Sequence, residues 1–127
     1  MPDYTKTLEL IVKSADARRA EDIEIFDISK ISSLADYFIV CTGSSDTNVR
    51  AISDSIETEL KEKLGITPHH VEGYKEADWV LLDYNNFLIH IFRGETRRFY
   101  SIERLWSDAA PSVDVSQFLP EKTTANQ

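Results

Sequence analysis

The feature that most constrains how this chain can fold is a pair of apolar stretches, residues 78–84 and 87–93, separated only by Asn85 and Asn86. Asparagine tolerates the left-handed backbone that a two-residue turn requires, so the sequence predicts a tight antiparallel β-hairpin. A turn this short also fixes which residues lie opposite one another. The expected cross-strand pairs are Tyr84 with Phe87, Leu82 with Ile89, Val80 with Ile91, and Asp78 with Arg93.

The two faces of this hairpin carry different side chains, because successive residues of a strand point to opposite sides. One face holds the apolar pairs and is expected to join the core. The other face would present Trp79, Leu81 and Asp83 beside Leu88, His90 and Phe92. That second face is apolar enough to need a cover, yet it carries a carboxylate and an imidazole. We therefore regard it as the first candidate for a functional surface, with His90 within hydrogen-bonding reach of its diagonal neighbour Asp83.

Hydrophobic periodicity predicts the remaining elements. Helices are expected over residues 4–20, 47–64 and 96–107, and strands over residues 23–28, 37–42 and 70–72. The apolar side of the last helix would consist of Phe99, Ile102, Leu105 and Trp106. This order predicts an α/β (α+β) fold with a single mixed β-sheet flanked by helices. The domain would span residues 1–110, and residues 111–127 would form a flexible tail.

The charge of the chain narrows the choice of partners. Its 127 residues include 22 Asp and Glu against 14 Lys and Arg, a formal net charge of −8. A protein this acidic is poorly suited to general binding of RNA or DNA, since phosphate contacts need Lys and Arg. It is better suited to a basic protein surface. One local group of cations, against only Glu95 and Glu103, would allow a minor contact with nucleic acid: Arg93, Arg97, Arg98 and Arg104.

Three features indicate where the protein acts. No run approaches the roughly eighteen apolar residues of a membrane span, and the N-terminus lacks the layout of a secretory signal. A single cysteine, Cys41, cannot form an internal disulfide, which suits a reducing compartment. We therefore expect a cytoplasmic protein without a membrane partner. Because Cys41 lies in an apolar strand, we also expect its thiol to be inert.

One turn raises the alternative of an enzyme. Residues 43–46, Gly-Ser-Ser-Asp, lie between an expected strand and helix, in a setting similar to that of nucleotidyltransferase-type enzymes. Such enzymes need two or three carboxylates aimed at a metal ion, and here only Asp46 and Asp54 accompany Ser44. A helix cap is the favoured interpretation, and a small metal-dependent nucleotidyltransferase using the Gly43-Ser44 turn is the alternative.

The remaining candidates for chemistry are weak. The three histidines, at positions 69, 70 and 90, do not have the spacing of zinc ligands with the single cysteine. We therefore expect no catalytic residue, no metal and no cofactor. The large aromatic residues indicate a contact surface instead, because Trp, Tyr and Arg most often anchor protein interfaces. Phe99 is assigned to the core, whereas Tyr100 is expected to share a side of the last helix with Arg97 and Arg104.

An ordered set of short motifs resembles one known family. The set comprises Cys41-Thr42-Gly43-Ser44, Glu72-Gly73, Ala77-Asp78-Trp79, Asp83, His90, and Arg98-x-Tyr100-x-x-Glu103-x-Leu105-Trp106. No single motif is specific, but the set as a whole is, and the resemblance covers nearly the whole chain, from about Leu8 to Ser107. In this order and spacing the chain resembles the ribosomal silencing factor (Iojap-related) family.

The resemblance implies a nucleotidyltransferase-like fold without the transferase chemistry. It further implies a translation repressor that binds the large ribosomal subunit through its fourteenth protein and sterically blocks joining of the small subunit. A minor contact with ribosomal RNA would fall to the arginine group, and free members of that family can be homodimers. By likeness, the partner-binding residues are Glu72, Asp78, Trp79, His90, Arg98, Tyr100, Glu103 and Trp106. Among these, Trp106 is the one most expected to be structural.

Overall fold

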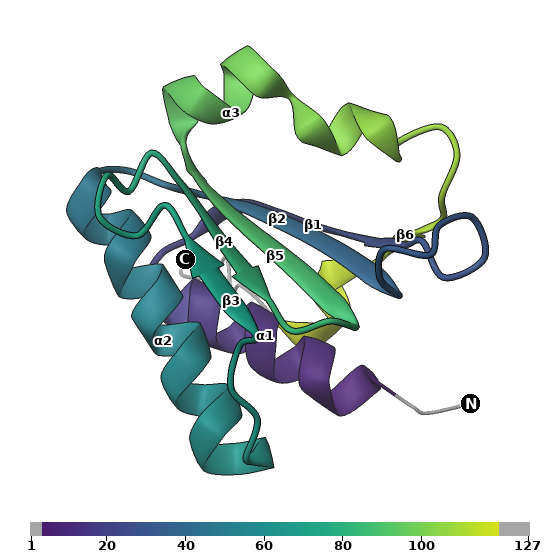
Figure 1. The fold of residues 1–127 in the computed structure, drawn as a ribbon, viewed down its shortest axis with the longest axis horizontal. Coiled ribbons are helices and arrows are strands. Elements are labelled where there is room, and N and C mark those ends of the chain that lie inside the picture. The colour runs from purple at the N-terminus through teal and green to yellow at the C-terminus, as the bar shows by residue number, and fades with distance from the viewer. Residues whose placement is uncertain (1–3, 120–127) are drawn as a thin grey trace, which may run out of the picture.

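A computed structural model describes residues 4–119, which form a six-stranded mixed sheet with helices on both faces (Figure 1). Along the chain the elements are α1 (Thr5–Ala17), β1 (Glu21–Asp27), β2 (Tyr37–Gly43), α2 (Asp46–Leu64), β3 (His70–Glu72), β4 (Trp79–Asp83), β5 (Phe87–Arg93), α3 (Gly94–Tyr100), the 3₁₀ helix η1 (Ile102–Leu105), β6 (Ser112–Val113) and the 3₁₀ helix η2 (Val115–Phe118). The strands lie in the order β3-β4-β5-β2-β1-β6. The predicted fold class, one mixed sheet flanked by helices, is confirmed.

β2 and β5 form the parallel centre of the sheet, and every other neighbouring pair within residues 4–119 is antiparallel. A parallel pair needs a long crossover connection, which α2, β3 and β4 supply. The continuous apolar run of β2 is buried on both faces, as predicted, from Phe38 to Gly43. The central strands of the sheet are therefore shielded from solvent on both faces, whereas the edge strands are exposed to it.

The hairpin of β4 and β5 has the predicted register. Asn85 takes the left-handed conformation that the two-residue turn requires, with φ of 69°. At the open end of the hairpin, Nη1 of Arg93 lies 2.9 Å from Oδ1 of Asp78, so the predicted charge pair is also present. The register partners are Trp79 with Phe92, Val80 with Ile91, Leu81 with His90, Leu82 with Ile89, and Asp83 with Leu88.

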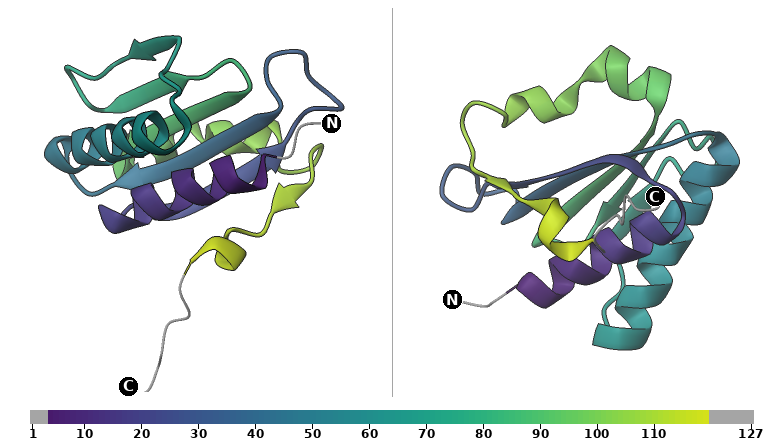
Figure 2. Two further views of the ribbon diagram at one scale, coloured as in Figure 1. Left: turned by 90° about the horizontal axis from the view of Figure 1, so that it is seen from below. Right: turned by 180° about the vertical axis from the view of Figure 1, so that it is seen from behind.

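Helices cover the two faces of the sheet unequally (Figure 2). α1 and α2 pack side by side on one face and enclose the larger hydrophobic cluster. α3 and η1 lie over the other face, which holds a smaller cluster. The side chains buried in the smaller cluster are Phe26, Ile28, Ala35, Phe38, Val40, Phe92 and Ala110. The second face of the hairpin thus has the cover that its apolar side chains require.

The last helix is shorter than predicted, and its apolar side chains are arranged differently. α3 ends before Ser101, which takes a left-handed conformation with φ of 46° and ψ of 47°. Such a residue resets the helical phase, so of the expected apolar side only Ile102 and Trp106 pack against the sheet. Phe99 and Leu105 are 80% and 67% exposed. The prediction that these two side chains belong to the core is wrong.

The chain beyond residue 110 also differs from the expected tail. Ser112–Val113 pairs with β1 as the edge strand β6, and Phe118 enters the larger hydrophobic cluster. Residues 111–119 therefore pack as part of the domain, because their apolar side chains complete a core that the rest of the chain leaves open. The remainder of the expected tail, residues 120–127, lies outside the described residues.

The two faces of β4 can be compared by substitution. Leu82 is fully buried in the larger hydrophobic cluster, whereas its neighbour Leu81 is half-buried on the opposite face. We expect Leu82→Ala to lower the free energy of unfolding by about 3 kcal/mol, and the matched Leu81→Ala by about 1 kcal/mol. Urea denaturation measures both values. A larger loss for Leu81→Ala would mean that the hairpin is paired one residue out of this register.

Candidate functional site

Four rings from three elements meet on the face of the sheet that α3 covers, at the end of β5 from which α3 begins. The ring centroid of Trp79, on β4, is 4.8 Å from that of Phe92 and 5.8 Å from that of His90, both on β5. It is 5.2 Å from that of Tyr100 on α3. Trp79 is half-buried and Tyr100 is 53% exposed. This group of four rings, which we call the aromatic site, therefore opens to solvent.

A hydrogen bond between Trp79 and His90 fixes the orientation of the indole ring. Nε1–H of Trp79 donates to Nδ1 of His90 at 2.9 Å. From the sequence, we expected Asp83 to lie within hydrogen-bonding reach of His90, and that expectation is not met. Trp79 and Asp83 are both diagonal neighbours of His90 across the hairpin, but Oδ1 of Asp83 accepts the N–H of Asn85 at 2.8 Å. The carboxylate is thus used to close the turn.

The imidazole of His90 is held neutral by its surroundings. His90 is 8% exposed, and burial lowers its pKa to about 4. Because Nδ1 accepts the indole hydrogen, the imidazole proton resides on Nε2, which is buried without a hydrogen-bond partner among residues 4–119. A histidine with so low a pKa is poorly matched to acid–base catalysis at neutral pH. Its contribution to the site is to hold Trp79.

Beneath α3, Arg97 joins the helix to the first two strands. Its guanidinium donates to Oγ1 of Thr42 at 2.8 Å and forms an ion pair with Glu24. Oε1 of Glu103 lies 3.7 Å from Nε of the same group. Arg97 is 7% exposed, so it does not share an outer side of the helix with Tyr100, contrary to the prediction. It also does not belong to an exposed cationic patch.

The eight residues expected to bind a partner occupy three kinds of position. The aromatic site brings together Trp79, His90 and Tyr100. Exposed positions are held by Glu72, Asp78 and Arg98. The remaining two lie between the sheet and the helices α3 and η1 that cover it. Glu103 is beside Arg97, and the ring centroid of Trp106 is 5.8 Å from that of Phe38. Trp106 is half-buried against the smaller cluster.

Sequence reasoning missed two exposed apolar residues beside this site. Phe99 and Leu105 extend the apolar surface from Tyr100 along α3 and η1, where they line an open hollow together with Arg98 and Arg104. The break at Ser101 exposes them, and neither Gly nor Pro marks that break in the sequence. A helical period applied across residues 96–107 therefore assigned both to the core.

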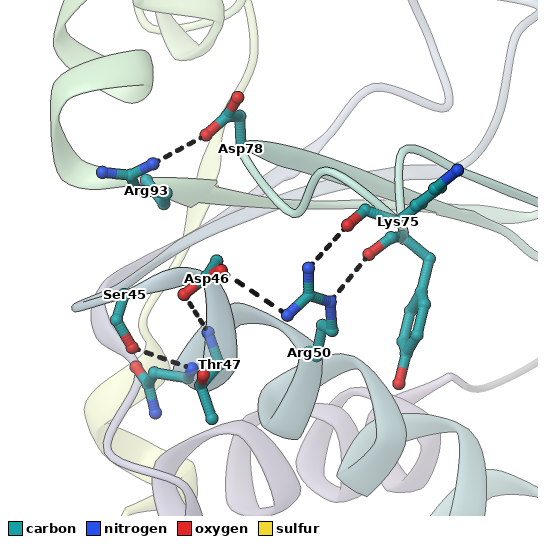
Figure 3. Close-up of polar contacts among 9 residues, drawn as sticks. Ser45, Asp46, Thr47, Arg50, Lys75, Asp78 and Arg93 are labelled. Atoms are coloured by element: carbon teal, nitrogen blue, oxygen red, sulfur yellow. Dashed lines mark hydrogen bonds and ion pairs between the residues drawn. The ribbon is translucent and has the colours of Figure 1, made fainter.

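The turn that raised the enzyme alternative serves as a helix cap (Figure 3). Ser45 is the N-cap of α2, and its Oγ accepts a backbone N–H three residues later at 3.0 Å. Oδ2 of Asp46 lies 3.6 Å from Nη1 of Arg50, and both carboxylate oxygens of Asp54 accept the hydroxyl of Tyr74 at 3.0 Å. Both carboxylates are thus engaged by other side chains. Within residues 4–119, no three His, Cys, Asp or Glu side chains are placed to hold a metal ion.

Two further expectations concern Cys41 and the membrane. Cys41 is 1% exposed, and burial raises the pKa of its thiol to about 12, so the side chain stays protonated and unreactive, as predicted. In the part of the chain that the structure describes, no helix combines the length and the apolar character needed to cross a bilayer.

Comparison with known proteins gives a consistent result. Residues 2–127 match the family model described as ribosomal silencing factor during starvation. The chain is 41% identical over 108 residues to the ribosomal silencing factor RsfS of Bacillus subtilis (strain 168), covering 85% of this chain and 90% of that protein. A crystal structure of a Chromobacterium violaceum protein superposes with a TM-score of 0.79 at 32% identity, covering 90% of this chain and 94% of the other. A mouse protein named mitochondrial assembly of ribosomal large subunit protein 1 is 26% identical over 102 residues, which cover 79% of this chain and 45% of that protein.

The neutral state of His90 predicts how stability depends on pH. The pKa is about 4 in the folded protein and about 6.5 in an unfolded chain. Unfolding therefore takes up a proton between these values, and stability falls as the pH drops through this window. Between pH 7 and pH 5, we expect His90 to account for a loss of about 2 kcal/mol in the free energy of unfolding.

The matched control is His90→Gln, which keeps a hydrogen-bond acceptor for Trp79 but does not titrate. Urea denaturation of both proteins at pH 7 and pH 5 isolates the histidine from the many carboxylates, because those are common to both. The wild type should lose about 2 kcal/mol more than the variant between these pH values. An equal loss in the two proteins would show that His90 is protonated normally in the folded state.

Proposed function

This chain belongs to the ribosomal silencing factor family, and from that premise we propose that it binds the large ribosomal subunit and blocks its joining to the small subunit. The contact on the subunit would be its fourteenth ribosomal protein. The observation that carries the proposal is the aromatic site, where a fixed Trp79 and a half-exposed Tyr100 lie with ring centroids 5.2 Å apart. Residues of these two types, held rigidly at a surface, are typical anchors of a protein interface.

The expected partner-binding residues have distinct roles in this proposal. Trp79 and Tyr100 would contact the partner directly, and His90 would act through Trp79. Glu72 would give the rim of the interface negative charge, and Asp78 would contact the partner there as a member of its pair with Arg93. Arg98 would form a rim contact on the other side, while Glu103 and Trp106 hold α3 and η1 against the sheet. Phe99 and Leu105 would add apolar area along the same cover.

Charge supports a protein partner. Ribosomal proteins are typically basic, and a chain with a net charge of −8 is attracted to a basic surface over a long range. We also propose a minor contact with ribosomal RNA, made by Arg98 and Arg104. These two arginines are exposed and form no ion pair within residues 4–119, whereas Arg93 and Arg97 are paired with acidic side chains.

The proposed mechanism is steric and involves no chemistry, so the protein would not be an enzyme. A standard interface buries about 800 Å² on each partner, roughly a tenth of the 7653 Å² that this chain exposes. Such an area can hold a domain of this size on a subunit, where its bulk excludes the other subunit. The nucleotidyltransferase alternative is not proposed, because the carboxylates at its turn are engaged within the chain. A cytoplasmic location follows from the proposed partner.

The central test is a substitution of the proposed anchor. Trp79→Ala should weaken binding to purified large subunits by more than about 1 kcal/mol, or at least roughly fivefold in Kd, because it removes the ring that Tyr100 and His90 position. Co-sedimentation measures the Kd, and circular dichroism confirms that the variant is folded. The control is Leu34→Ala, which truncates an exposed side chain in the loop between β1 and β2. This loop precedes β2 and so lies at the end of the sheet away from the aromatic site.

The same preparation tests the mechanism. Added protein should slow the joining of large and small subunits, followed by light scattering, and Trp79→Ala should slow it less. A folded Trp79→Ala that binds normally would remove the aromatic site from the interface. If the folded wild-type protein does not bind large subunits, or if it turns over a nucleotide, the proposed function is overturned.

A further inference from the structure

We infer that Arg50, on α2, is a positioning residue for partner binding: it clamps the loop of residues 73–78 and thereby sets the placement of Trp79. This inference rests on the proposed function of the aromatic site and adds a residue that lies outside it. None of the motifs that resemble the family includes Arg50, and no contact with a partner is assigned to it. Its effect on binding would be transmitted through the loop.

The loop of residues 73–78 is packed directly on the backbone at Trp79. Gly73 has φ of 80°, and a Cβ at this position would overlap the carbonyl oxygen of Trp79. The N–H of Ala77 donates to the carbonyl of Gly73 at 2.9 Å and closes the loop. Ala77 is itself fully buried, with φ of 57°. A displacement of this closed loop therefore moves the start of β4, where Trp79 lies.

Two side chains of α2, Arg50 and Asp54, hold the outer side of the loop, and Figure 3 shows the contacts of Arg50. Nε–H of Arg50 donates to the carbonyl of Tyr74 at 3.1 Å, and Nη2–H donates to the carbonyl of Lys75 at 2.5 Å. The hydroxyl of Tyr74 in turn donates to the carboxylate of Asp54 at 3.0 Å. Asp46, Arg50 and Asp54 are spaced four residues apart and so lie on one side of the helix. We call Arg50, Tyr74 and Asp54 the loop clamp.

Ala77 and Asp78 anchor the end of the loop that leads into β4, and the clamp holds its exposed outer part. Tyr74, Lys75 and Glu76 are exposed, and so is every residue of the three-residue edge strand β3 that precedes them. Short exposed edges with few buried apolar contacts open locally at low free-energy cost. The planar guanidinium of Arg50 satisfies two loop carbonyls at once, which a lysine does not reproduce.

Two independent constraints thus converge on Trp79. His90 fixes its indole ring from the sheet, and the loop clamp supports, from α2, the loop that leads into it. Because an anchor that is already ordered loses less freedom on binding, the clamp should contribute to affinity without touching the partner. α2 covers the opposite face of the sheet from α3 and Tyr100 (Figure 1), which argues against a direct contact by Arg50.

A double-mutant cycle separates positioning from contact. The proteins are the wild type, Arg50→Ala, Trp79→Ala and the double variant, and the measurement is the Kd for purified large subunits. Arg50→Ala should weaken binding several-fold when Trp79 is present, and should cost nothing further in the Trp79→Ala background. Arg50→Lys should fall between wild type and Arg50→Ala. Lys61→Ala, which removes an exposed cation from the same helix, should bind normally.

A second readout reports on the indole itself. In a nitrogen-15 NMR spectrum, the Nε1–H signal of Trp79 should shift or broaden in Arg50→Ala, while that of Trp106 stays in place. Tyr74→Phe removes only the hydrogen bond to Asp54 and should produce the same changes to a smaller extent. This variant keeps the test available if Arg50→Ala does not fold.

The outcomes distinguish this inference from the proposed function. If Trp79→Ala weakens binding but Arg50→Ala and Tyr74→Phe do not, the clamp inference is overturned and the proposed function stands. Equal losses from Arg50→Ala in both backgrounds would also overturn it, because Arg50 would then act independently of Trp79. If large subunits do not bind the wild type, the proposed function fails first, and the clamp loses its role with it.

Discussion

The pairing of β4 with β5 governs the rest of the structure, because a single register assigns every side chain of the hairpin to one of two faces. One face, which includes Tyr84 and Phe87 beside the turn, lies toward α1 and α2 and makes up much of the larger core. The other face carries Trp79, His90 and Phe92. A shift of one residue would exchange the two sets and place Trp79 and His90 in the aliphatic core. Stability and the candidate site therefore depend on the same set of backbone hydrogen bonds.

The cover over the second face is held mainly by polar contacts. Arg97 is the only buried residue of α3, and η1 has none. The guanidinium ties the helix to β1 and β2, and Ile102 and Trp106 fill the space behind it. Because the cover does not rely on its remaining apolar side chains for attachment, Phe99 and Leu105 stay on the outside. An exposed apolar group of this kind, beside the aromatic site, is characteristic of a docking surface.

Much of the fold could be predicted because its signals are local. The two asparagines fix the hairpin, the alternation in β4 and β5 separates the faces, and Gly65, with φ of 67°, ends α2 as a left-handed cap. The site was predicted only in part. The resemblance to the family pointed to Trp79, His90 and Tyr100, but the hydrogen-bond partner of His90, the exposure of Phe99 and the burial of Arg97 were not foreseen. Each of these depends on competition among neighbours that only the folded chain brings together.

The sequence by itself determined five of the six strands, the hairpin register, the cap of α2 and the family, because turns, alternation and ordered motifs depend on residues close together in the chain. The tertiary structure alone decided which charged side chains are buried or clamped. Arg97 meets Glu24 from 73 residues away, and Arg50 meets the carbonyl of Tyr74 from 24 residues away. From sequence alone, an arginine is expected at the surface. Whether it instead connects two elements of the fold depends on hydrogen-bond acceptors that distant segments bring within reach.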